Sequence, residues 1–480
     1  MSRHRNVKQW IEEDDYYDDD YYDDDDYYDE YDDAPPKPVV KKVPPKKAPA
    51  AAKKPAPPAP SKKPDVKNLL VPPTLPSTSS TVVVLGHVDA GKSTLTGHLL
   101  TAPSSSTSNT TSNFSWLLDE DENERLHGIT MDVAVKVWED RLVVLDAPGH
   151  VDYVPYTISG AALADVALLV VDAKDPDTLG NLWEHVVCAR GLGVGKWMVL
   201  INKLDAVNYR KSVYDKVEQQ LKATLDSLLQ GHEVLYLPTA GTTGANLFEN
   251  KDMPWYEGPT LVQQLRSLPN LPYKDGPLRM VVTDVRGEQG KGVLVRAKVL
   301  QGWVKQQEKL QLLPWNDATS WNKWQTLCDG TTTHKAVRAE MWVEGVLEKI
   351  EIQRIAIGHI LARPQALPPI ASHCVASIEL WTASNKASTS SVPLIRGSSV
   401  ILHISQLQVP VHLSKLIQAT RKDKSVKSNP RVLAGFLTAE VEIRTSQPLV
   451  MDASCEGLSR FVLRRGGQTI AIGRITKVIS

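Results

Sequence analysis

The stretch "TVVVLGHVDAGKS", residues 81 to 93, joins a continuous apolar run to a glycine-rich turn that ends in Lys92 and Ser93. Such a run predicts a strand buried on both faces of a parallel sheet. Four later runs have the same texture, and each precedes a turn and a segment of helix length: "DRLVVLDAPG", "DVALLVVDA", "KWMVLINKLD" and "EVLYLPTAG". The sequence therefore predicts a doubly wound α/β domain whose ligand lies at the carboxyl ends of the strands.

The pattern changes from about Gly276 to alternating strands with glycine turns and little helix, as in "KGVLVRAKVLQGWVKQQEKLQLL". Two consecutive small β-barrels are the natural interpretation, divided near residues 362 to 369. We therefore expect the α/β domain at residues 81 to 272 and the two barrels at residues 273 to 367 and 368 to 480.

The first 80 residues have a different composition. Residues 11 to 33 contain no basic residue, whereas residues 34 to 67 are dominated by Lys, Pro and Ala. Neither block can bury enough apolar surface to offset the entropy of ordering. A disordered N-terminal extension over residues 1 to 80 is the expectation.

Cysteine usage and hydropathy indicate the cellular setting. The four cysteines lie far apart and form neither a metal-ligand spacing nor a dense disulfide framework. The start "MSRHRNVKQW" has no apolar signal region, and no run of about 18 apolar residues occurs. We expect a reduced, cytoplasmic chain without a membrane partner, acting as a monomer.

The turn "GHVDAGKS" fits the phosphate-binding loop, which requires a strand before it and a helix after it. Its glycines allow backbone amides to turn toward phosphates, Lys92 supplies a cation to them, and the Ser93 hydroxyl can ligate Mg²⁺. An ordinary glycine-rich turn is the alternative, and the strand-to-helix context disfavours it. The predicted nucleotide-binding residues here are Gly86, His87, Val88, Asp89, Ala90, Gly91, Lys92, Ser93 and Thr94.

Two further motifs complete a nucleotide site. Asp146 ends a predicted strand, where its carboxylate could hold Mg²⁺, and the Gly149 amide can reach a γ-phosphate. In "NKLD", Asp205 can accept hydrogen bonds from N1–H and the exocyclic amine of guanine, while Asn202 supports the base and Lys203 lies along it. Adenine lacks that donor pair, so the sequence predicts GTP rather than ATP.

These motifs resemble those of translational GTPases, and the resemblance covers residues 81 to 480. It implies that His150, which follows "DAPG", orients the attacking water. It also implies that the apolar Val88 and Ile129 restrain this histidine, and that Thr130 is a second hydroxyl ligand of Mg²⁺. An imidazole can align water for phosphoryl transfer, which depends mostly on positioning.

Within the family, "GITMDV", residues 128 to 133, is most similar to HBS-one-like ribosome-rescue factors of the elongation factor one-alpha subfamily. "SRFVLRRGGQTIAIGRITKV", residues 459 to 478, resembles them too. The resemblance implies a GTPase that brings a Pelota-like partner to stalled ribosomes. An elongation factor for aminoacyl-tRNA, a class II release factor and a non-hydrolysing scaffold remain as alternatives.

Several positions depart from the family pattern. His127 replaces a usual Arg, Val151 and Tyr156 replace the residues that usually follow the histidine, and the segment "TAPSSSTSNTTSNFS" is short. Ala240 stands where a guanine-contacting Ser is usual. The backbone amides of Ala240 and Gly241 are expected to reach the guanine O6 instead, with some loss of affinity.

Overall fold

The computed structural model describes residues 80–101, 133–139, 141–174, 179–289, 292–329, 336–381 and 393–479. The N-terminal extension up to residue 79 lies outside this part, as do His127, Ile129 and Thr130 of the first switch. All described residues belong to one compact unit. The four cysteines are free thiols. No helix among the described residues is both long and apolar enough to cross a membrane.

The first domain is built on a six-stranded sheet with the order β2-β3-β1-β4-β5-β6. Its strands are β1 (Thr81–Gly86), β2 (Ala134–Trp138), β3 (Leu142–Asp146), β4 (Val166–Asp172), β5 (Lys196–Asn202) and β6 (Val234–Pro238). The five strands predicted from apolar runs pair in parallel, which confirms the α/β fold. β2 pairs antiparallel to β3 at the edge and was not predicted. It is half-buried along most of its length, so its sequence lacks a continuous apolar run.

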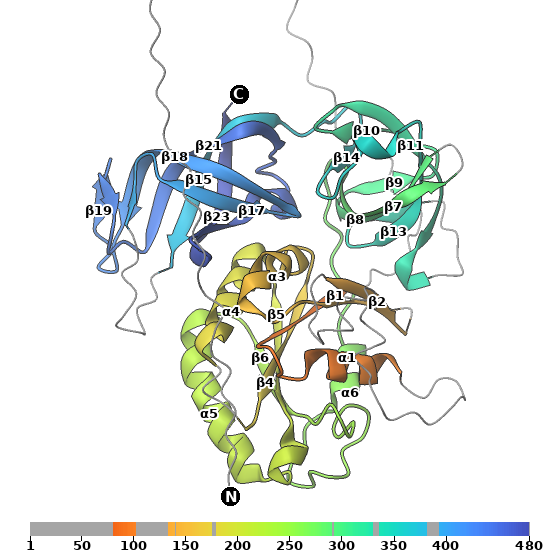
Figure 1. Ribbon diagram of the computed structural model, residues 1–480, viewed down its shortest axis with the longest axis vertical. Coiled ribbons are helices and arrows are strands. Elements are labelled where there is room, and N and C mark those ends of the chain that lie inside the picture. Colours follow the sequence, from red (N-terminus) through yellow and green to blue (C-terminus); the bar gives the residue numbers. More distant parts are fainter. Residues whose placement is uncertain are drawn as a thin grey trace, which may run out of the picture. The chain divides into compact units, whose positions relative to one another are not determined.

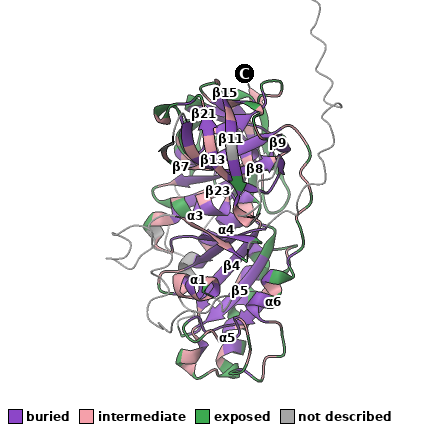
Figure 2. Cartoon of the chain, turned by 90° about the vertical axis from the view of Figure 1, so that its right-hand side faces the viewer, coloured by how far each residue is buried: buried purple, intermediate pink, exposed green. Residues whose placement is uncertain are grey.

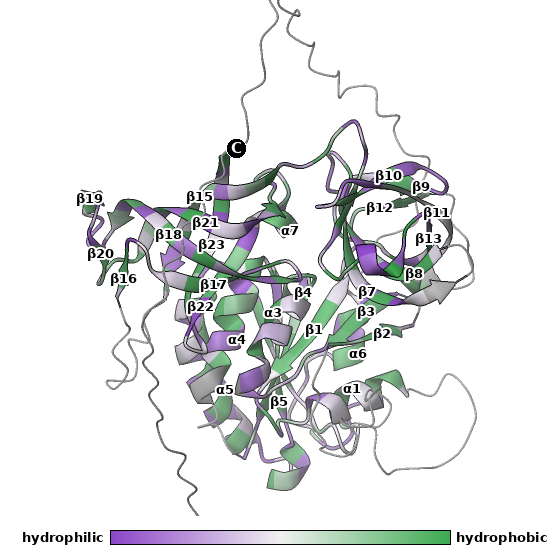
Figure 3. Ribbon diagram, turned by 45° about the horizontal axis from the view of Figure 1, so that its top comes forward, coloured by the Kyte–Doolittle hydropathy of each residue, from purple (hydrophilic) through white to green (hydrophobic). Residues whose placement is uncertain are grey.

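Helices cover both faces of this sheet (Figure 1). They are α1 (Lys92–Leu100), α3 (Val154–Ala161), α4 (Leu179–Leu192), α5 (Lys211–Leu228) and α6 (Leu261–Arg266), with short 3-10 turns η3 (Val151–Tyr153) and η5 (Leu204–Val207). Alternate residues of β1 enter different cores. Val82 and Val84 pack in the cluster that contains Leu95 of α1, whereas Val83 packs in the cluster that contains Val186 of α4. This two-sided burial explains why β1 is apolar throughout, as the hydropathy colours of Figure 3 show.

The second domain is a closed barrel with the order β10-β11-β13-β8-β7-β14. Its strands are β7 (Arg279–Gln289), β8 (Gly292–Gln301), β10 (Lys309–Leu313), β11 (Asp317–Thr326), β13 (Trp342–Glu348) and β14 (Ile360–Ala362), with β9 (Trp303–Lys305) paired to β12 (Ala336–Arg338) and the turns η6 (Leu327–Asp329) and η7 (Ile352–Arg354). Trp321 and Trp324 pack in its core with their rings edge to face, 6.0 Å apart. These aromatic rings therefore fill the barrel.

The third domain is also a barrel, because β17 pairs with both β22 and β18 and closes the sheet β17-β22-β23-β15-β21-β18. Its elements are β15 (Ile370–Leu380), β16 (Leu394–Ile395), β17 (Ser399–Ile404), β18 (Leu407–Thr420), β19 (Val426–Ser428), β20 (Val432–Leu433), β21 (Thr438–Val450), α7 (Glu456–Ser459), β22 (Arg460–Arg465) and β23 (Gln468–Ile479). The two predicted barrels are confirmed.

Polar side chains join the first domain to each barrel. The buried Lys298 of β8 donates to the Leu163 carbonyl oxygen at 2.6 Å and pairs with Glu340 at 2.8 Å. On α4, the buried Glu184 accepts hydrogen bonds from the Thr469 amide at 3.0 Å and its hydroxyl at 2.6 Å. The α4 helix therefore packs against the sheet of the first domain and also contacts the third domain.

Candidate functional site

The loop between β1 and α1 has the geometry of an anion site. Gly91, directly before α1, has φ of 89°, a left-handed conformation that favours glycine. A Cβ at Gly91 would also lie 2.5 Å from the Asn202 side-chain nitrogen. The loop therefore turns tightly into the N-terminus of α1, where backbone amides and the helix dipole favour negative charge.

Lys92 is the first residue of α1, and its ammonium group curls back over the loop. It is buried and donates to the His87 carbonyl oxygen at 2.9 Å. Burial lowers the pKa of Lys92, while the nearby carboxylates of Asp146 and Asp89 act in the opposite direction. A buried cation at the N-terminus of a helix suits the β- and γ-phosphates of a nucleotide.

The ends of β3 and β1 meet at this lysine. Asp146 is the last residue of β3 and is buried, as Figure 2 shows for the strands of this sheet generally. A Cβ on Gly149 would lie 2.2 Å from the Lys92 ammonium nitrogen and 2.8 Å from the Gly86 carbonyl oxygen. Only glycine fits there. The structure thus brings together the residues that the sequence assigned to phosphate binding.

The donor set at this place fits a magnesium ion. Ser93 lies in the first turn of α1, and the carboxylate of Asp146 ends the neighbouring strand. Hydroxyl and carboxylate oxygens are the ligands that Mg²⁺ prefers. The third predicted ligand, Thr130, lies outside the described residues.

His150 directly precedes η3, and its side chain is 41% exposed. Its Nδ1 atom accepts a hydrogen bond from the Asp152 amide at 3.3 Å and lies 3.3 Å from an Asp152 carboxylate oxygen. The imidazole centroid is 5.9 Å from the ring of Tyr153. In this structure the His150 ring therefore contacts its own turn. Tyr156 on the next helix is 44% exposed.

The base side of the site depends on Asn202, the last residue of β5. Its buried side chain donates to the Ala90 carbonyl oxygen at 2.8 Å and accepts from the Gly241 amide at 2.9 Å. The Thr239 hydroxyl lies 3.4 Å from the side-chain oxygen of Asn202. Asn202 therefore holds the phosphate loop and the loop after β6 to each other.

The next residues of "NKLD" present charges at the strand ends. Lys203 adopts φ of 62°, and its ammonium group pairs with Asp172, the last residue of β4, at 2.8 Å. Asp205 accepts a hydrogen bond from the Thr242 hydroxyl at 2.9 Å through Oδ2. Its Oδ1 atom is buried and has no hydrogen-bond partner among the described residues. The residue as a whole is only partly buried, so a base can approach the carboxylate at this edge of the sheet.

The backbone amides of Ala240 and Gly241, which the sequence assigns to guanine O6, have acceptors within the protein. The Ala240 amide donates to the Ala245 carbonyl oxygen at 3.2 Å, and the Gly241 amide donates to Asn202. Contact with guanine O6 would therefore require either amide to share or exchange its present acceptor. The Gly241 carbonyl oxygen lies 2.9 Å from the Nδ1 atom of His98 on α1, which further fixes the loop.

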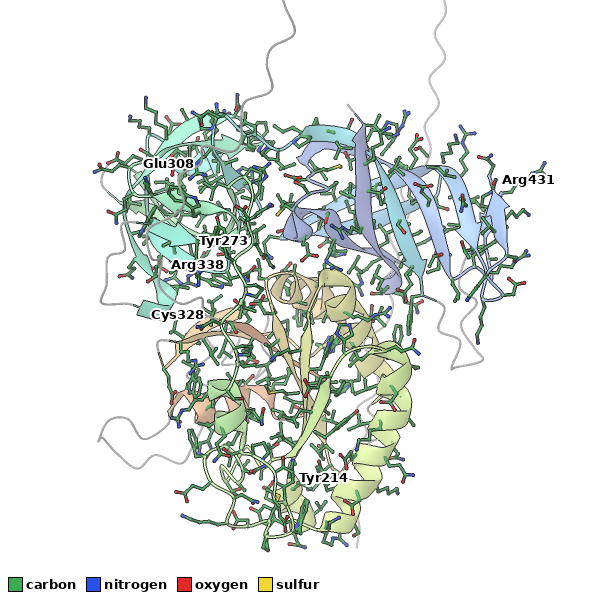
Figure 4. The ribbon with its side chains drawn as sticks, turned by 180° about the vertical axis from the view of Figure 1, so that it is seen from behind. Tyr214, Tyr273, Glu308, Cys328, Arg338 and Arg431 are labelled. Carbon is green, nitrogen blue, oxygen red and sulfur yellow. The ribbon has the colours of Figure 1, made fainter. Side chains whose placement is uncertain are left out.

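Three residues of the site were not predicted: Asp172, Thr242 and His98. The position of Asp172 at the carboxyl end of a parallel strand is a signal that could have identified it. The segment after Asp205 is held by an aromatic contact. Tyr214 of α5, labelled in Figure 4, lies with its ring 5.3 Å from that of Trp255, which donates to the Tyr209 carbonyl oxygen at 2.8 Å.

Comparisons with known proteins agree with this geometry. Residues 77–399 match the family model of the elongation factor Tu GTP binding domain, and residues 387–476 match a GTP-eEF1A C-terminal domain-like model. The chain is 33% identical to protein HBS1 of Drosophila melanogaster over an alignment of 431 residues, and the match covers 83% of this chain and 63% of that protein. It therefore spans less than two thirds of that relative.

Two more relatives extend the comparison. Elongation factor 1-alpha of Desulfurococcus mucosus is 31% identical over an alignment of 436 residues, and the match covers 83% of this chain and 96% of that protein. The GTP-bound Ski7 GTPase-like domain of S. cerevisiae superimposes with a TM-score of 0.63 and 20% identity, covering 83% of this chain and 97% of that one. At this identity the structural likeness concerns the fold alone.

Proposed function

Because the chain belongs to the translational GTPases, the family with an elongation factor Tu GTP-binding domain, we propose that its GTP form delivers a Pelota-like protein to stalled ribosomes. The chain is a GTP-binding protein and a GTPase. In this proposal, hydrolysis releases the chain so that its cargo, a relative of the release factors, can occupy the empty site. The process belongs to cytoplasmic no-go and non-stop mRNA surveillance.

The observation that carries the proposal is the 33% identity to protein HBS1 over 431 residues, which extends through all three described domains. The first-switch sequence "GITMDV" supports the same subgroup. The elongation factor 1-alpha relative, 31% identical, supports the family and leaves delivery of aminoacyl-tRNA as the competing cargo.

The chemistry follows from the positions around Lys92. Its ammonium group neutralises phosphate charge, and Gly149 approaches the same group closely because it has no side chain. Ser93, Asp146 and Thr130 would hold Mg²⁺, which shields the phosphates when bound. His150 would align the attacking water after its ring leaves Asp152. Since the ring is engaged within its own turn, contact with the ribosome is the proposed trigger for that rotation.

A parallel pull-down tests the choice of cargo. The purified full chain, loaded with a nonhydrolysable GTP analogue or with GDP, is offered the Pelota-like protein, the class I release factor and aminoacyl-tRNA of the same organism. The expected result is retention of the Pelota-like protein by the GTP form. The Lys92→Ala variant, which lacks the phosphate cation, serves as the matched control and should show no nucleotide dependence. Retention of either other cargo in its place would overturn the rescue assignment and leave the GTPase unaffected.

A further inference from the structure

The carboxylate of Asp205 has to be held in one orientation if it is to read guanine. A carboxylate recognises the N1–H and exocyclic amine of guanine with both oxygens at once, so its plane must match the plane of the base. Asp205 lies in the short turn η5 and is only partly buried. Ala240, where the family usually has a guanine-contacting Ser, is fully buried and has no side-chain hydroxyl to offer.

A different hydroxyl contacts the carboxylate. The Thr242 side chain donates to Asp205 Oδ2 at 2.9 Å from two residues beyond Ala240. The other oxygen, Oδ1, is buried and unpaired among the described residues. The Thr242 hydroxyl thus fixes the plane of the carboxylate, and each carboxylate oxygen keeps lone-pair capacity to accept from a guanine base.

We propose that Thr242 is the positioning residue that sets the guanine selectivity of this chain, orienting Asp205 in place of the hydroxyl that Ala240 lacks. The inference rests on the assignment of Asp205 to the guanine base and makes no use of the cargo. It replaces the expectation that Ala240 weakens nucleotide binding. Threonine suits the task because its β-branched side chain has few rotamers, so the hydroxyl direction is largely fixed by the backbone.

The neighbouring threonine does something else and supplies a control. The Thr243 hydroxyl lies 3.1 Å from the Tyr209 hydroxyl and accepts from the Ala245 amide at 3.4 Å, so it closes its own turn. Both threonines are exposed and sit in the same loop. A substitution of either perturbs the loop, whereas only Thr242 contacts the carboxylate.

The test compares GDP with inosine diphosphate, whose base lacks the exocyclic amine and so makes one hydrogen bond fewer with Asp205. Affinities of the purified chain for both nucleotides are measured for wild type, Thr242→Val, Thr242→Ser and Thr243→Val. Valine has the shape of threonine without its hydroxyl, and serine keeps the hydroxyl. Removing a hydrogen bond of this kind is worth about two- to tenfold in affinity.

We expect Thr242→Val to lose about two- to tenfold of the preference for GDP over inosine diphosphate. Thr242→Ser should keep that preference. Thr243→Val should lower the affinities for GDP and inosine diphosphate by the same factor or leave both unchanged. An unchanged preference for GDP in Thr242→Val would overturn the proposal. An equal loss of that preference in Thr242→Val and Thr243→Val would overturn it too. If the wild-type chain bound ADP with the same affinity as GDP, the assignment of Asp205 to guanine would be refuted. No cargo or ribosome is present, so failure of the rescue function would not affect this outcome.

Discussion

The Asn202 side-chain nitrogen donates a hydrogen bond to the carbonyl oxygen of Ala90 across 2.8 Å. The same side chain accepts from the Gly241 amide, so one buried residue links the phosphate loop to the loop that faces the base. Neither loop belongs to a regular element at these points. The Asn202 amide group therefore connects the phosphate and base halves of the nucleotide site, together with the contact between His98 and the Gly241 carbonyl oxygen.

Replacing Asn202 with alanine should weaken nucleotide binding strongly. The substitution leaves a buried carbonyl oxygen and a buried amide unpaired, each at a cost of about 1 to 3 kcal/mol. We expect GDP affinity to fall by a factor of about ten or more, measured by fluorescence of a labelled nucleotide. Asn208→Gly, in the exposed turn just after η5, is the control and should bind normally, because glycine tolerates the left-handed backbone of Asn208. Normal binding by Asn202→Ala would show that the two loops hold each other without this amide.

Adding one methyl group at Gly149 should impair hydrolysis. Its Cβ would lie 2.2 Å from the Lys92 ammonium nitrogen and 2.8 Å from the Gly86 carbonyl oxygen, so the backbone has to withdraw from the phosphate loop. We expect Gly149→Ala to slow single-turnover GTP hydrolysis by at least about tenfold, because a displacement of one ångström costs much of a positioning effect. Gly195→Ala is a matched control, since its Cβ would meet nothing within 4 Å. Equal rates in the two variants would contradict the close approach.

His150 should matter for turnover and little for binding. Its imidazole contacts Asp152 and Tyr153 within its own turn. We expect His150→Ala to bind GTP with nearly wild-type affinity and to lose ribosome-stimulated hydrolysis by about 10²-fold or more, the usual contribution of such a group. His232→Ala, whose ring contacts the carbonyl oxygen of Gly195, is the control. Equal stimulated rates in His150→Ala and wild type would reject the catalytic role.

The sequence predicted the site residues that directly end or follow an apolar strand. Lys92, Asp146 and Asn202 each end or follow an apolar strand, so their side chains had to meet at one edge of a parallel sheet. The edge strand β2 was missed because its half-buried residues carry a weaker pattern. Thr242 was missed for another reason. Its contact with Asp205 depends on how two loops meet, which neither periodicity nor motif spacing specifies.

Glu184 should be a major contributor to stability through its contact with the third domain. Its buried carboxylate accepts from the amide and hydroxyl of Thr469 and lies 3.3 Å from the Arg464 guanidinium group. Removing one partner of a buried pair costs about 3 to 5 kcal/mol, because the other charge stays buried. We therefore expect Glu184→Ala to lower the free energy of unfolding by about this amount, measured by urea denaturation.

The control for Glu184 is Glu379→Ala, which breaks a more exposed ion pair between the same two domains. Glu379 pairs with Arg190 and is 46% exposed on its side chain. Such pairs contribute about 0 to 1 kcal/mol. Similar losses in Glu184→Ala and Glu379→Ala would show that burial does not distinguish the two contacts.

His185, next to Glu184 on α4, should make the fold sensitive to acid. Burial lowers the pKa of His185 to about 3, and the positive charges of Lys92, His87 and Arg464 act in the same direction. The unfolded chain binds a proton at this histidine near pH 6.5, whereas the folded chain does not. Stability is therefore lost as pH falls from about 6.5 toward 3, by up to about 1.4 kcal/mol per pH unit.

The variant His185→Gln tests this directly, because glutamine is neutral throughout that range. We expect the free energy of unfolding of His185→Gln to fall less steeply than that of wild type between pH 6.5 and pH 5, measured by urea titration at each pH. His403 has its pKa lowered to about 4, first by burial, and contributes its own slope to both proteins. The difference between the two slopes isolates His185. Parallel pH profiles would mean that His185 gains its proton in the folded chain as readily as in the unfolded one, contrary to its burial.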